Sequence, residues 1–318
     1  MSLADVRHRL EYGLVVGVRA TVEVLPEASS RWLGTLVGLF FYVVDGSHRR
    51  LAVAQLQAAF PVRSEAECRA IARRTFVHFG QVLVGTLKIS TLSRSEVLSR
   101  VEFEGVDRIK TALSRGRGVI VFSGHFGNWE LLSHAHALVL PPMWLLARPL
   151  DNPYLHRLLE DVRRKPGSHV IYRQGALRRV LRALNNNEVV GILIDQHIHG
   201  SDAVAVDFFN RPAATTAALA TLSERTGAPI VPAFALPLPD GRFRVVYEHP
   251  VDLPPGEDTP NKVQVLTQRC SDVLEMYVRR HPHLWLWMHR RWRTVPHANA
   301  PVAEMFPAGA HEEGEAAE

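Results

Sequence analysis

The first hundred residues carry apolar side chains at the spacing of helices rather than of strands. We predict helices over residues 3–25, 31–44, 48–59 and 64–88. The fourth begins at Ser64 with two glutamates in its first turn, where the helix dipole favours negative charge. Residues 1–100 are therefore expected to form a helical N-terminal subdomain.

From Val101 onward, short β-branched runs alternate with helical segments. This alternation predicts an α/β domain over residues 101–300, with a mostly parallel mixed sheet and helices on both of its faces. The expected strands lie near 118–123, 143–147, 169–171, 188–194, 204–208, 229–235 and 242–248. The expected helices lie near 106–115, 128–139, 152–165, 174–185, 214–226 and 260–280.

One predicted strand leads directly to a histidine. Residues 118–122 are almost wholly apolar and β-branched, which is typical of a strand buried on both faces. Ser123 and Gly124 end the run, His125 follows, and Asn128 is placed to cap the next helix. Because ligands of open α/β sheets bind at the carboxyl ends of the strands, His125 is a candidate catalytic residue.

Glu130 is the acidic residue nearest to this histidine in sequence. Positions five apart lie roughly 140° apart around a helix axis, so His125 and Glu130 can converge only across a turn. In that arrangement the carboxylate fixes the tautomer of the ring and leaves the second nitrogen free to take a proton. The alternative is a capping turn that holds a buried, fully hydrogen-bonded histidine, and the spacing leaves both interpretations open.

Two further candidates end neighbouring apolar runs. Arg148 follows residues 143–147, and Asp195 with Gln196 follows residues 189–194. The arginines between 157 and 182, among them Arg163, either form a solvated helix face or bind phosphate groups bidentately through their planar guanidinium groups. Asp195 also precedes His197 and His199, which allows a metal site or an ordinary loop.

The sequence lacks the motifs of several common nucleotide-binding, nucleophilic and cysteine-based sites. The glycines at 116 and 118 precede a strand, whereas a dinucleotide-binding fingerprint follows one. The chain has no phosphate-binding Gly-Lys-Ser/Thr loop and no Gly-x-Ser-x-Gly nucleophile elbow. Its two cysteines, Cys68 and Cys270, are far apart and show no spacing of a disulfide framework or metal site, which fits a reducing compartment.

The charge pattern predicts anionic partners. Residues 303–318 carry five glutamates and no lysine or arginine, and we expect residues 301–318 to form an acidic disordered tail. Without those five glutamates, 27 acidic residues face 37 lysines and arginines. Anionic lipid headgroups, phosphopantetheine carriers and nucleic acid all satisfy this charge.

No secretory signal is expected in residues 1–25. The apolar stretches 12–25 and 32–44 are interrupted by charge or too short to span a bilayer, which needs roughly 20 residues. This length favours stretches that lie on a membrane, so the subdomain over residues 1–100 is expected to associate with membranes. Packing of the same side chains in the core is the alternative. The tryptophans and arginines of residues 285–293 likewise suit a lipid headgroup layer or a packed chain end.

The segment Gly-His-Phe-Gly-Asn-Trp-Glu at 124–130 resembles the His-x4-acid block of the glycerolipid acyltransferase superfamily. Its glutamate variant is similar to that of the late lipid A acyltransferases of Gram-negative bacteria, the lauroyl and myristoyl transferases. Residues 148–153, 195–196, 208–215 and 285–293 resemble the later blocks, in the same order. Asn210 stands where glycine is usual, and residues 197–199 replace a more acidic run.

The resemblance implies a glycerolipid acyltransferase-like fold and acyl transfer from an acyl carrier protein or coenzyme A thioester to a hydroxyl of a lipid A precursor. It implies His125 as general base oriented by Glu130, and no metal or other cofactor. We add the backbone amides of residues 126–128 as candidate oxyanion donors. Substrate-binding residues are expected at Asn128, Arg148, Asn152, Arg163, Asp195 and Gln196.

The resemblance also implies a peripheral or monotopic location at the cytoplasmic face of the bacterial inner membrane, with no nucleic acid partner. Another glycolipid, such as a phosphatidylinositol mannoside, is the alternative acceptor. Two rival hypotheses remain: a metal-dependent hydrolase using His125, Asp195 and the histidines after it, and a non-catalytic basic module that binds lipid or nucleic acid. Acyl chain length, donor and oligomeric state stay open.

Overall fold

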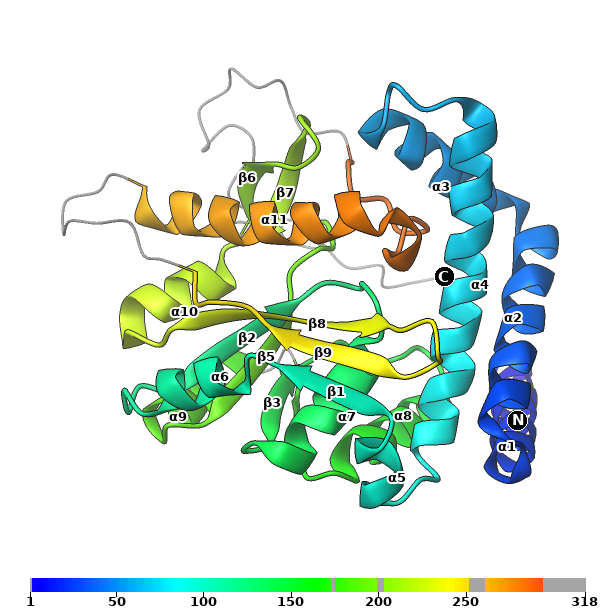
Figure 1. Cartoon of the computed structure of the whole chain (residues 1–318), viewed down its shortest axis with the longest axis horizontal. Helices are drawn as coiled ribbons and strands as arrows, with labels where there is room; N and C mark the ends of the chain where they lie inside the picture. The colour runs from blue at the N-terminus through cyan, green and yellow to red at the C-terminus, as the bar shows by residue number, and fades with distance from the viewer. Residues whose placement is uncertain (1, 173–174, 199–202, 252–260, 294–318) are drawn as a thin grey trace.

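The computed structural model describes residues 2–172, 175–198, 203–251 and 261–293. Five helices precede the first strand of the described chain: α1 (Leu3–Val24), α2 (Glu27–Val44), α3 (Gly46–Ala59), α4 (Glu65–Ile89) and α5 (Arg94–Leu98). Figure 1 shows their positions at one side of the molecule. Helix α4 begins after Ser64 as predicted, with Glu65 and Glu67 in its first turn. Ser64 and Glu67 also form a capping box, because the Ser64 side chain accepts from the Glu67 amide and the Glu67 carboxylate accepts from the Ser64 amide. The short helix α5 was not predicted. The boundary between the subdomains at residue 100 remains a prediction.

The large sheet has seven strands in the order β1-β9-β8-β2-β5-β3-β4. Its strands are β1 (Val101–Glu104), β2 (Val119–Ser123), β3 (Met143–Leu146), β4 (His169–Ile171), β5 (Val189–Leu193), β8 (Ile230–Pro237) and β9 (Phe243–Tyr247). Only the β8–β9 pair is antiparallel. The predicted mostly parallel mixed sheet is therefore confirmed.

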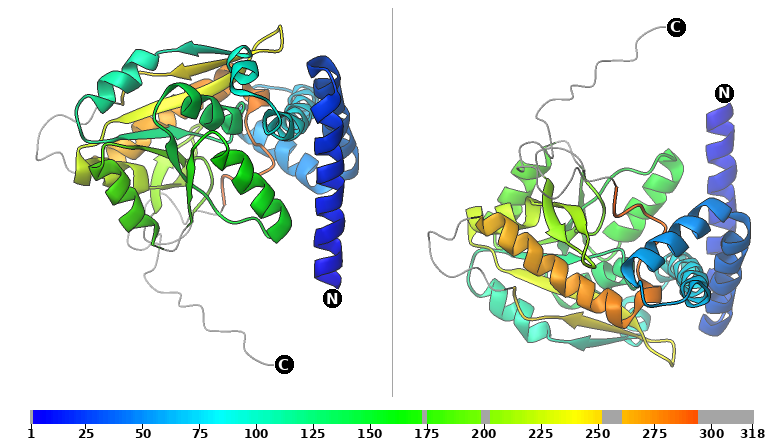
Figure 2. Two further views of the ribbon diagram at one scale, coloured as in Figure 1. Left: turned by 90° about the horizontal axis from the view of Figure 1, so that it is seen from below. Right: turned by 90° about the horizontal axis from the view of Figure 1, so that it is seen from above.

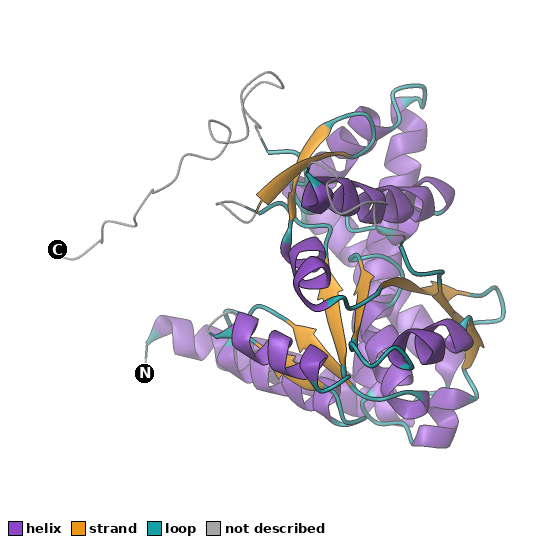
Figure 3. Ribbon diagram, turned by 90° about the vertical axis from the view of Figure 1, so that its left-hand side faces the viewer, coloured by secondary structure: helices purple, strands orange, loops and turns teal. Residues whose placement is uncertain are grey.

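Residues 203–216 differ from the prediction. They form a separate antiparallel pair, β6 (Ala203–Asp207) and β7 (Pro212–Thr216), and helix α10 (Ala218–Thr226) begins only after it. The sequence pattern predicts a helix from residue 214, which the structure corrects to residue 218. Phe209 and Asn210 adopt positive φ, which makes the tight turn that folds β7 back along β6. Figure 3 shows this pair apart from the large sheet, with α11 (Lys262–Arg280) beside it.

Helices cover both faces of the sheet, as predicted. The strand β2 is buried throughout, and its side chains alternate between the two cores: Ile120 and Phe122 face one, Val119 and Val121 the other. The first core also receives side chains of α9 (Ala176–Asn185), α10 and α11, and the second those of α6 (Val106–Leu113) and α7 (Trp129–Val139). Helices α3 and α4 belong to the first core too, so the N-terminal helices are not an independent layer.

Helices α1 and α2 lie outside α4 at one edge of the molecule, and Figure 2 shows the start of α1 extending beyond the body. Backbones of α2 and α4 touch, because a Cβ on Gly38 would lie 2.3 Å from the Phe76 carbonyl oxygen. The end of α1 is held by Lys88, whose Nζ donates to the carbonyl oxygens of Val22 and Leu25 at 2.5 and 2.8 Å. Along the described parts of the chain, no helix combines the length and the hydropathy needed to span a bilayer.

Candidate functional site

His125 and Asp195 meet at the carboxyl ends of two adjacent parallel strands. His125 follows β2, Asp195 follows β5, and Ser123 lies opposite Leu193 in the register. The ring Nδ1 of His125 is 2.9 Å from Asp195 Oδ1, and the His125 amide donates to Asp195 Oδ2 at 2.7 Å. The prediction that both residues lie at one edge of the sheet is confirmed.

The carboxylate of Asp195 is buried and receives a third hydrogen bond. The indole Nε1 of Trp285 donates to Asp195 Oδ2 at 2.8 Å. Trp285 is itself buried, and an isolated β-bridge joins its backbone to that of Phe126, next to the histidine. The orientation of Asp195 is thus set by both neighbouring segments.

His125 and Asp195 shift each other's pKa values. Burial alone would lower the pKa of His125, but the charge and hydrogen bond of Asp195 outweigh burial and raise that pKa above its usual value. Burial alone would raise the pKa of Asp195, but His125 and the hydrogen bonds to the carboxylate hold it below its usual range. The ring with this raised pKa is not sealed inside the protein, because 21% of the His125 side chain is exposed.

Glu130 does not make the predicted hydrogen bond to His125. Its carboxylate instead forms a two-pronged ion pair with Arg163 of α8 (Pro153–Arg164), at 2.6 and 3.0 Å, and accepts from the Trp129 indole at 3.1 Å. Glu130 is the second residue of α7, which directs its side chain towards α8, whereas the ring Nδ1 faces β5. The charge of Glu130 still reaches His125 and helps to raise its pKa.

The other predicted arginine and glutamine lie at the same edge. Arg148 follows β3 and is exposed, and Gln196 is exposed directly after Asp195. Arg163 is bound to Glu130 near the start of α7, and its charge acts to lower the pKa of His125. The structure thus places Arg148, Arg163 and Gln196 around the carboxyl edge, with Arg163 already bound to Glu130.

The two predicted asparagines serve as helix caps. Asn128 caps α7 as expected, and its buried side chain accepts from the Leu131 amide at 3.0 Å. Asn152 caps α8, and its amide nitrogen donates to the His8 carbonyl and to Glu11 of α1. Since Asn152 is buried and its oxygen and nitrogen are both engaged, its predicted contact with substrate does not fit this geometry.

The predicted oxyanion donors need the same correction. The Gly127 amide donates to the Leu284 carbonyl oxygen at 2.9 Å, and the Asn128 amide donates to that of Ala235 at 3.0 Å. These bonds fix the loop after His125 against β8 and the chain end. The amides of residues 127 and 128 are therefore engaged within the protein and do not point at a substrate.

The tryptophan and arginine motif near the chain end packs inside the protein. Trp285, Trp287 and Arg291 are each buried to within 2% exposure. The Arg291 guanidinium donates to the Ala214 carbonyl oxygen at 2.7 Å and to the Thr215 hydroxyl, and burial lowers the pKa of Arg291 to about 10. Sequence reasoning left open whether this motif is a headgroup layer or a packed end, and for these three residues the packed interpretation is correct.

An apolar groove of about 290 Å³ runs between α2 and α4. Phe41, Phe79 and Met288 line it. The Trp129 ring contacts both Phe79 and His125, with ring centroids 5.7 and 5.1 Å apart. Trp129 therefore connects the groove to the candidate base.

The metal-site hypothesis gains no support from the geometry. Among the residues that the structure describes, no group of three His, Cys, Asp or Glu side chains could hold a metal ion. His199 lies outside the described residues, as does the predicted acidic tail at 301–318. Asp195 is already bound to His125 and Trp285.

Known proteins of similar sequence include several acyltransferases. A lipid A biosynthesis acyltransferase of Haemophilus influenzae is 25% identical over 91% of this chain and 92% of its own length. A lipid A biosynthesis lauroyltransferase of Escherichia coli is 26% identical over 89% and 91%. A phosphatidylinositol mannoside acyltransferase of Mycobacterium tuberculosis is 24% identical over 67% of each chain. The model of the bacterial lipid A biosynthesis acyltransferases matches residues 4–294, and the chain belongs to that family.

Proposed function

We propose that this acyltransferase moves a fatty acyl group from a thioester to a hydroxyl of a lipid A precursor, with His125 as general base. The observation that carries the proposal is the hydrogen-bonded series Trp285, Asp195, His125 at the carboxyl edge of the sheet. It ends in a partly exposed imidazole whose pKa is raised. This is the arrangement of a positioned base.

The proton steps follow from the roles of the two ring nitrogens. An ionised Asp195 can only accept, so Nδ1 carries the hydrogen and Nε2 is the nitrogen that takes a proton. His125 removes the hydroxyl proton of the acceptor as its oxygen attacks the thioester carbonyl. A C–O bond forms, the C–S bond breaks, and the imidazolium returns its proton to the departing thiolate.

The state of the two cysteines favours direct transfer between the substrates over a mechanism with an acyl-cysteine intermediate. Cys68 and Cys270 are both buried, and burial raises the pKa of each thiol. A buried, protonated thiol is a poor nucleophile. The acyl group therefore passes between the two substrates without a cysteine intermediate.

The arginines at the edge suit phosphate groups, which a lipid A precursor and a pantetheine thioester both carry. Arg148 is exposed there, and Arg163 is held in place by Glu130. We assign Glu130 the role of fixing Arg163 and of adding negative charge near the imidazolium. We assign contact with the acceptor to Gln196, the remaining predicted site residue with an exposed side chain.

Lipid A precursor is the preferred acceptor because the first relatives are lipid A acyltransferases over about nine-tenths of the chain. A phosphatidylinositol mannoside is the alternative, supported by a relative that aligns with two-thirds of the chain. Acyl carrier protein and coenzyme A remain equal candidates for the donor.

Membrane association is part of the proposal. Helices α1 and α2 expose large apolar side chains, including Leu10, Leu14, Phe40 and Val43 at 61–71%. Such a surface suits a peripheral or monotopic protein at the cytoplasmic face of the inner membrane, where the apolar groove would admit an acyl chain.

The test is transfer of labelled acyl groups in detergent micelles, with each donor paired with each acceptor. We expect the wild type to acylate the lipid A precursor and His125→Ala to lose about 10²- to 10⁴-fold in rate while staying folded. If only the phosphatidylinositol mannoside is acylated, the assigned acceptor is wrong, but the assignment of His125 as general base in acyl transfer stands. Full activity in His125→Ala would overturn the assignment of the base.

A further inference from the structure

A second cavity lies away from the acyl-transfer site. It has a volume of about 400 Å³, within the range of small-molecule sites, and is enclosed by α2, α4, the start of α7 and the β8–β9 hairpin. Val82, Leu92 and Phe243 give it an apolar wall. None of these residues has a part in the proposed reaction.

Helix α4 lies between this cavity and the apolar groove that Trp129 connects to His125. The helix turns Phe79 and Leu83 towards the groove on the histidine side and Val82 and Gly85 towards the second cavity. The loop after His125 completes the wall, since the buried His78 ring is hydrogen-bonded to the Gly127 carbonyl oxygen at 3.0 Å. The two sites therefore lie back to back.

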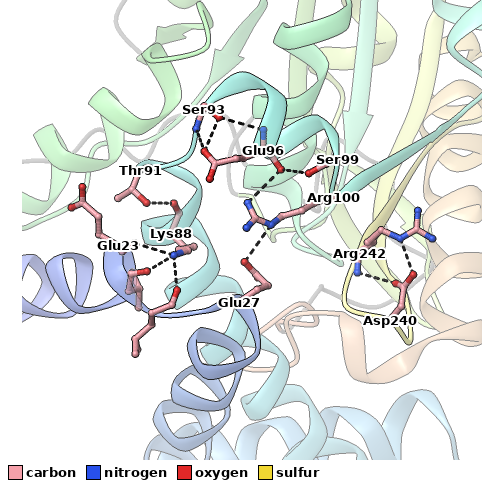
Figure 4. A network of polar contacts seen from close by, with 12 residues as sticks. Glu23, Glu27, Lys88, Thr91, Ser93, Glu96, Ser99, Arg100, Asp240 and Arg242 are labelled. Atoms are coloured by element: carbon pink, nitrogen blue, oxygen red, sulfur yellow. Dashed lines mark hydrogen bonds and ion pairs between the residues drawn. The ribbon is translucent and has the colours of Figure 1, made fainter.

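The second cavity is positively charged, with Arg31, Lys88 and Arg100 against Glu27. Two of the cations are engaged, as Figure 4 shows: Lys88 binds the end of α1, and Arg100 pairs with Glu27 at 3.4 Å. In the described part of the chain, no carboxylate pairs with Arg31. Its guanidinium lies against the Gly241 backbone of the hairpin, where a Cβ would be 2.2 Å away.

The cavity also borders the apolar surface of α2. Trp32 lines it and is 66% exposed, and Leu36 and Phe40 continue from Trp32 at intervals of four residues. An amphiphile that rests against this stripe can place its chain in the cavity and its anionic group on Arg31.

We infer that the second cavity binds an anionic membrane phospholipid, with one acyl chain inside and the phosphate on Arg31. The site would tie the enzyme to anionic bilayers without entering the transfer reaction. The inference does not depend on the identity of the acyl acceptor.

The test uses the His125→Ala protein, so that no probe can be consumed by transfer. The probe is phosphatidylglycerol with a photoreactive diazirine at the end of one chain, compared with the same phosphatidylcholine. We expect phosphatidylglycerol to crosslink to residues 82–97 and to Phe243, as mapped by mass spectrometry. Arg31→Glu should weaken this labelling roughly tenfold or more, whereas Arg178→Glu on the exposed face of α9 should not.

Filling the cavity gives an independent check. A Cβ on Gly85 meets nothing closer than the Asn128 side-chain nitrogen at 4.0 Å, so Gly85→Leu should fold and block the chain, and Gly85→Ala should leave room. With His125 intact, both variants should keep acyl transfer from a soluble donor.

Three outcomes would overturn the inference. The first is equal labelling by both lipids, unchanged in Arg31→Glu. The second is labelling spread over α1 and α2, which would mean surface contact only. The third is loss of acyl transfer in a folded Gly85→Leu, which would place the cavity in the reaction site.

Discussion

At the scale of single residues, Asp195 is the group on which the site depends, because three hydrogen bonds converge on its buried carboxylate. Removing the indole donor in Trp285→Phe keeps the aromatic packing and frees Asp195 to turn. We expect kcat to fall about tenfold and the free energy of unfolding to fall by about 2 kcal/mol. Steady-state kinetics and denaturant titration measure both.

Trp287→Phe is the matched control for this change. Trp287 is equally buried and donates to the Pro282 carbonyl oxygen at 2.6 Å, away from Asp195. It should lose comparable stability and keep its kcat. Equal loss of kcat in the two variants would mean that Trp285 acts through packing alone.

Sequence reasoning identified His125 and Asp195 separately but paired His125 with the wrong acid. The position of His125 after an apolar strand was readable, because parallel strands deliver side chains to one edge. Its partner was not, because Asp195 is 70 residues away and the β2–β5 pairing that joins them is non-local. Glu130 was nearest in sequence, but the start of α7 turns it towards Arg163.

Asn152 is a predicted substrate-binding residue that the structure places in a helix cap instead. Asn152→Ala removes the cap of α8 and the bonds to α1, so we expect the free energy of unfolding to fall by about 1–2 kcal/mol with KM for both substrates unchanged. Asn152→Asp keeps a capping oxygen and should recover part of the loss. A raised KM at unchanged stability would restore Asn152 as a substrate-binding residue.

At the scale of elements, α2 and α4 pack through glycines. Gly38→Ala would place a Cβ 2.3 and 2.6 Å from backbone atoms of Phe76 and Val77, so the helices must separate. We expect a loss of about 1–3 kcal/mol in the free energy of unfolding, measured by denaturant titration.

Gly13→Ala in the neighbouring helix α1 is the control. Nothing lies within 4 Å of its Cβ, so the higher helix propensity of alanine should stabilise the protein by about 0.5–1 kcal/mol. Similar losses in the two variants would contradict the close contact.

The elements that escaped prediction share a physical cause. Residues 212–216 read Pro-Ala-Ala-Thr-Thr, which lacks the large β-branched side chains of a buried strand, so the run was absorbed into the next helix. Strand β1 is four residues at the edge of the sheet, with two glutamates that face outwards. Both strands are defined by their partners, β6 and β9, rather than by their own pattern.

At the scale of the whole molecule, the apolar surface of α2 should hold the protein on membranes. Leu36→Asp combined with Phe40→Asp should weaken binding to anionic vesicles at least tenfold, because each side chain loses its burial in the interface. Leu177→Asp on α9, which replaces a leucine of 52% exposure, should not. Co-sedimentation with vesicles measures the difference, and equal binding by all three proteins would contradict this orientation.

The pH dependence of kcat/KM for wild type, Asp195→Asn and Glu130→Gln tests the central claim most directly. The base must be neutral, so the wild-type rate should rise through a His125 pKa above its usual 6.5. Asp195→Asn removes the negative charge that offsets the effect of burial on His125. The pH at which kcat/KM rises should therefore move below 6.5, and the maximal kcat/KM should fall. Glu130→Gln should shift the pH of this rise by a smaller amount. If the pH of the rise is unchanged in Asp195→Asn but shifts in Glu130→Gln, the assignment is contradicted and Glu130 is the partner of His125.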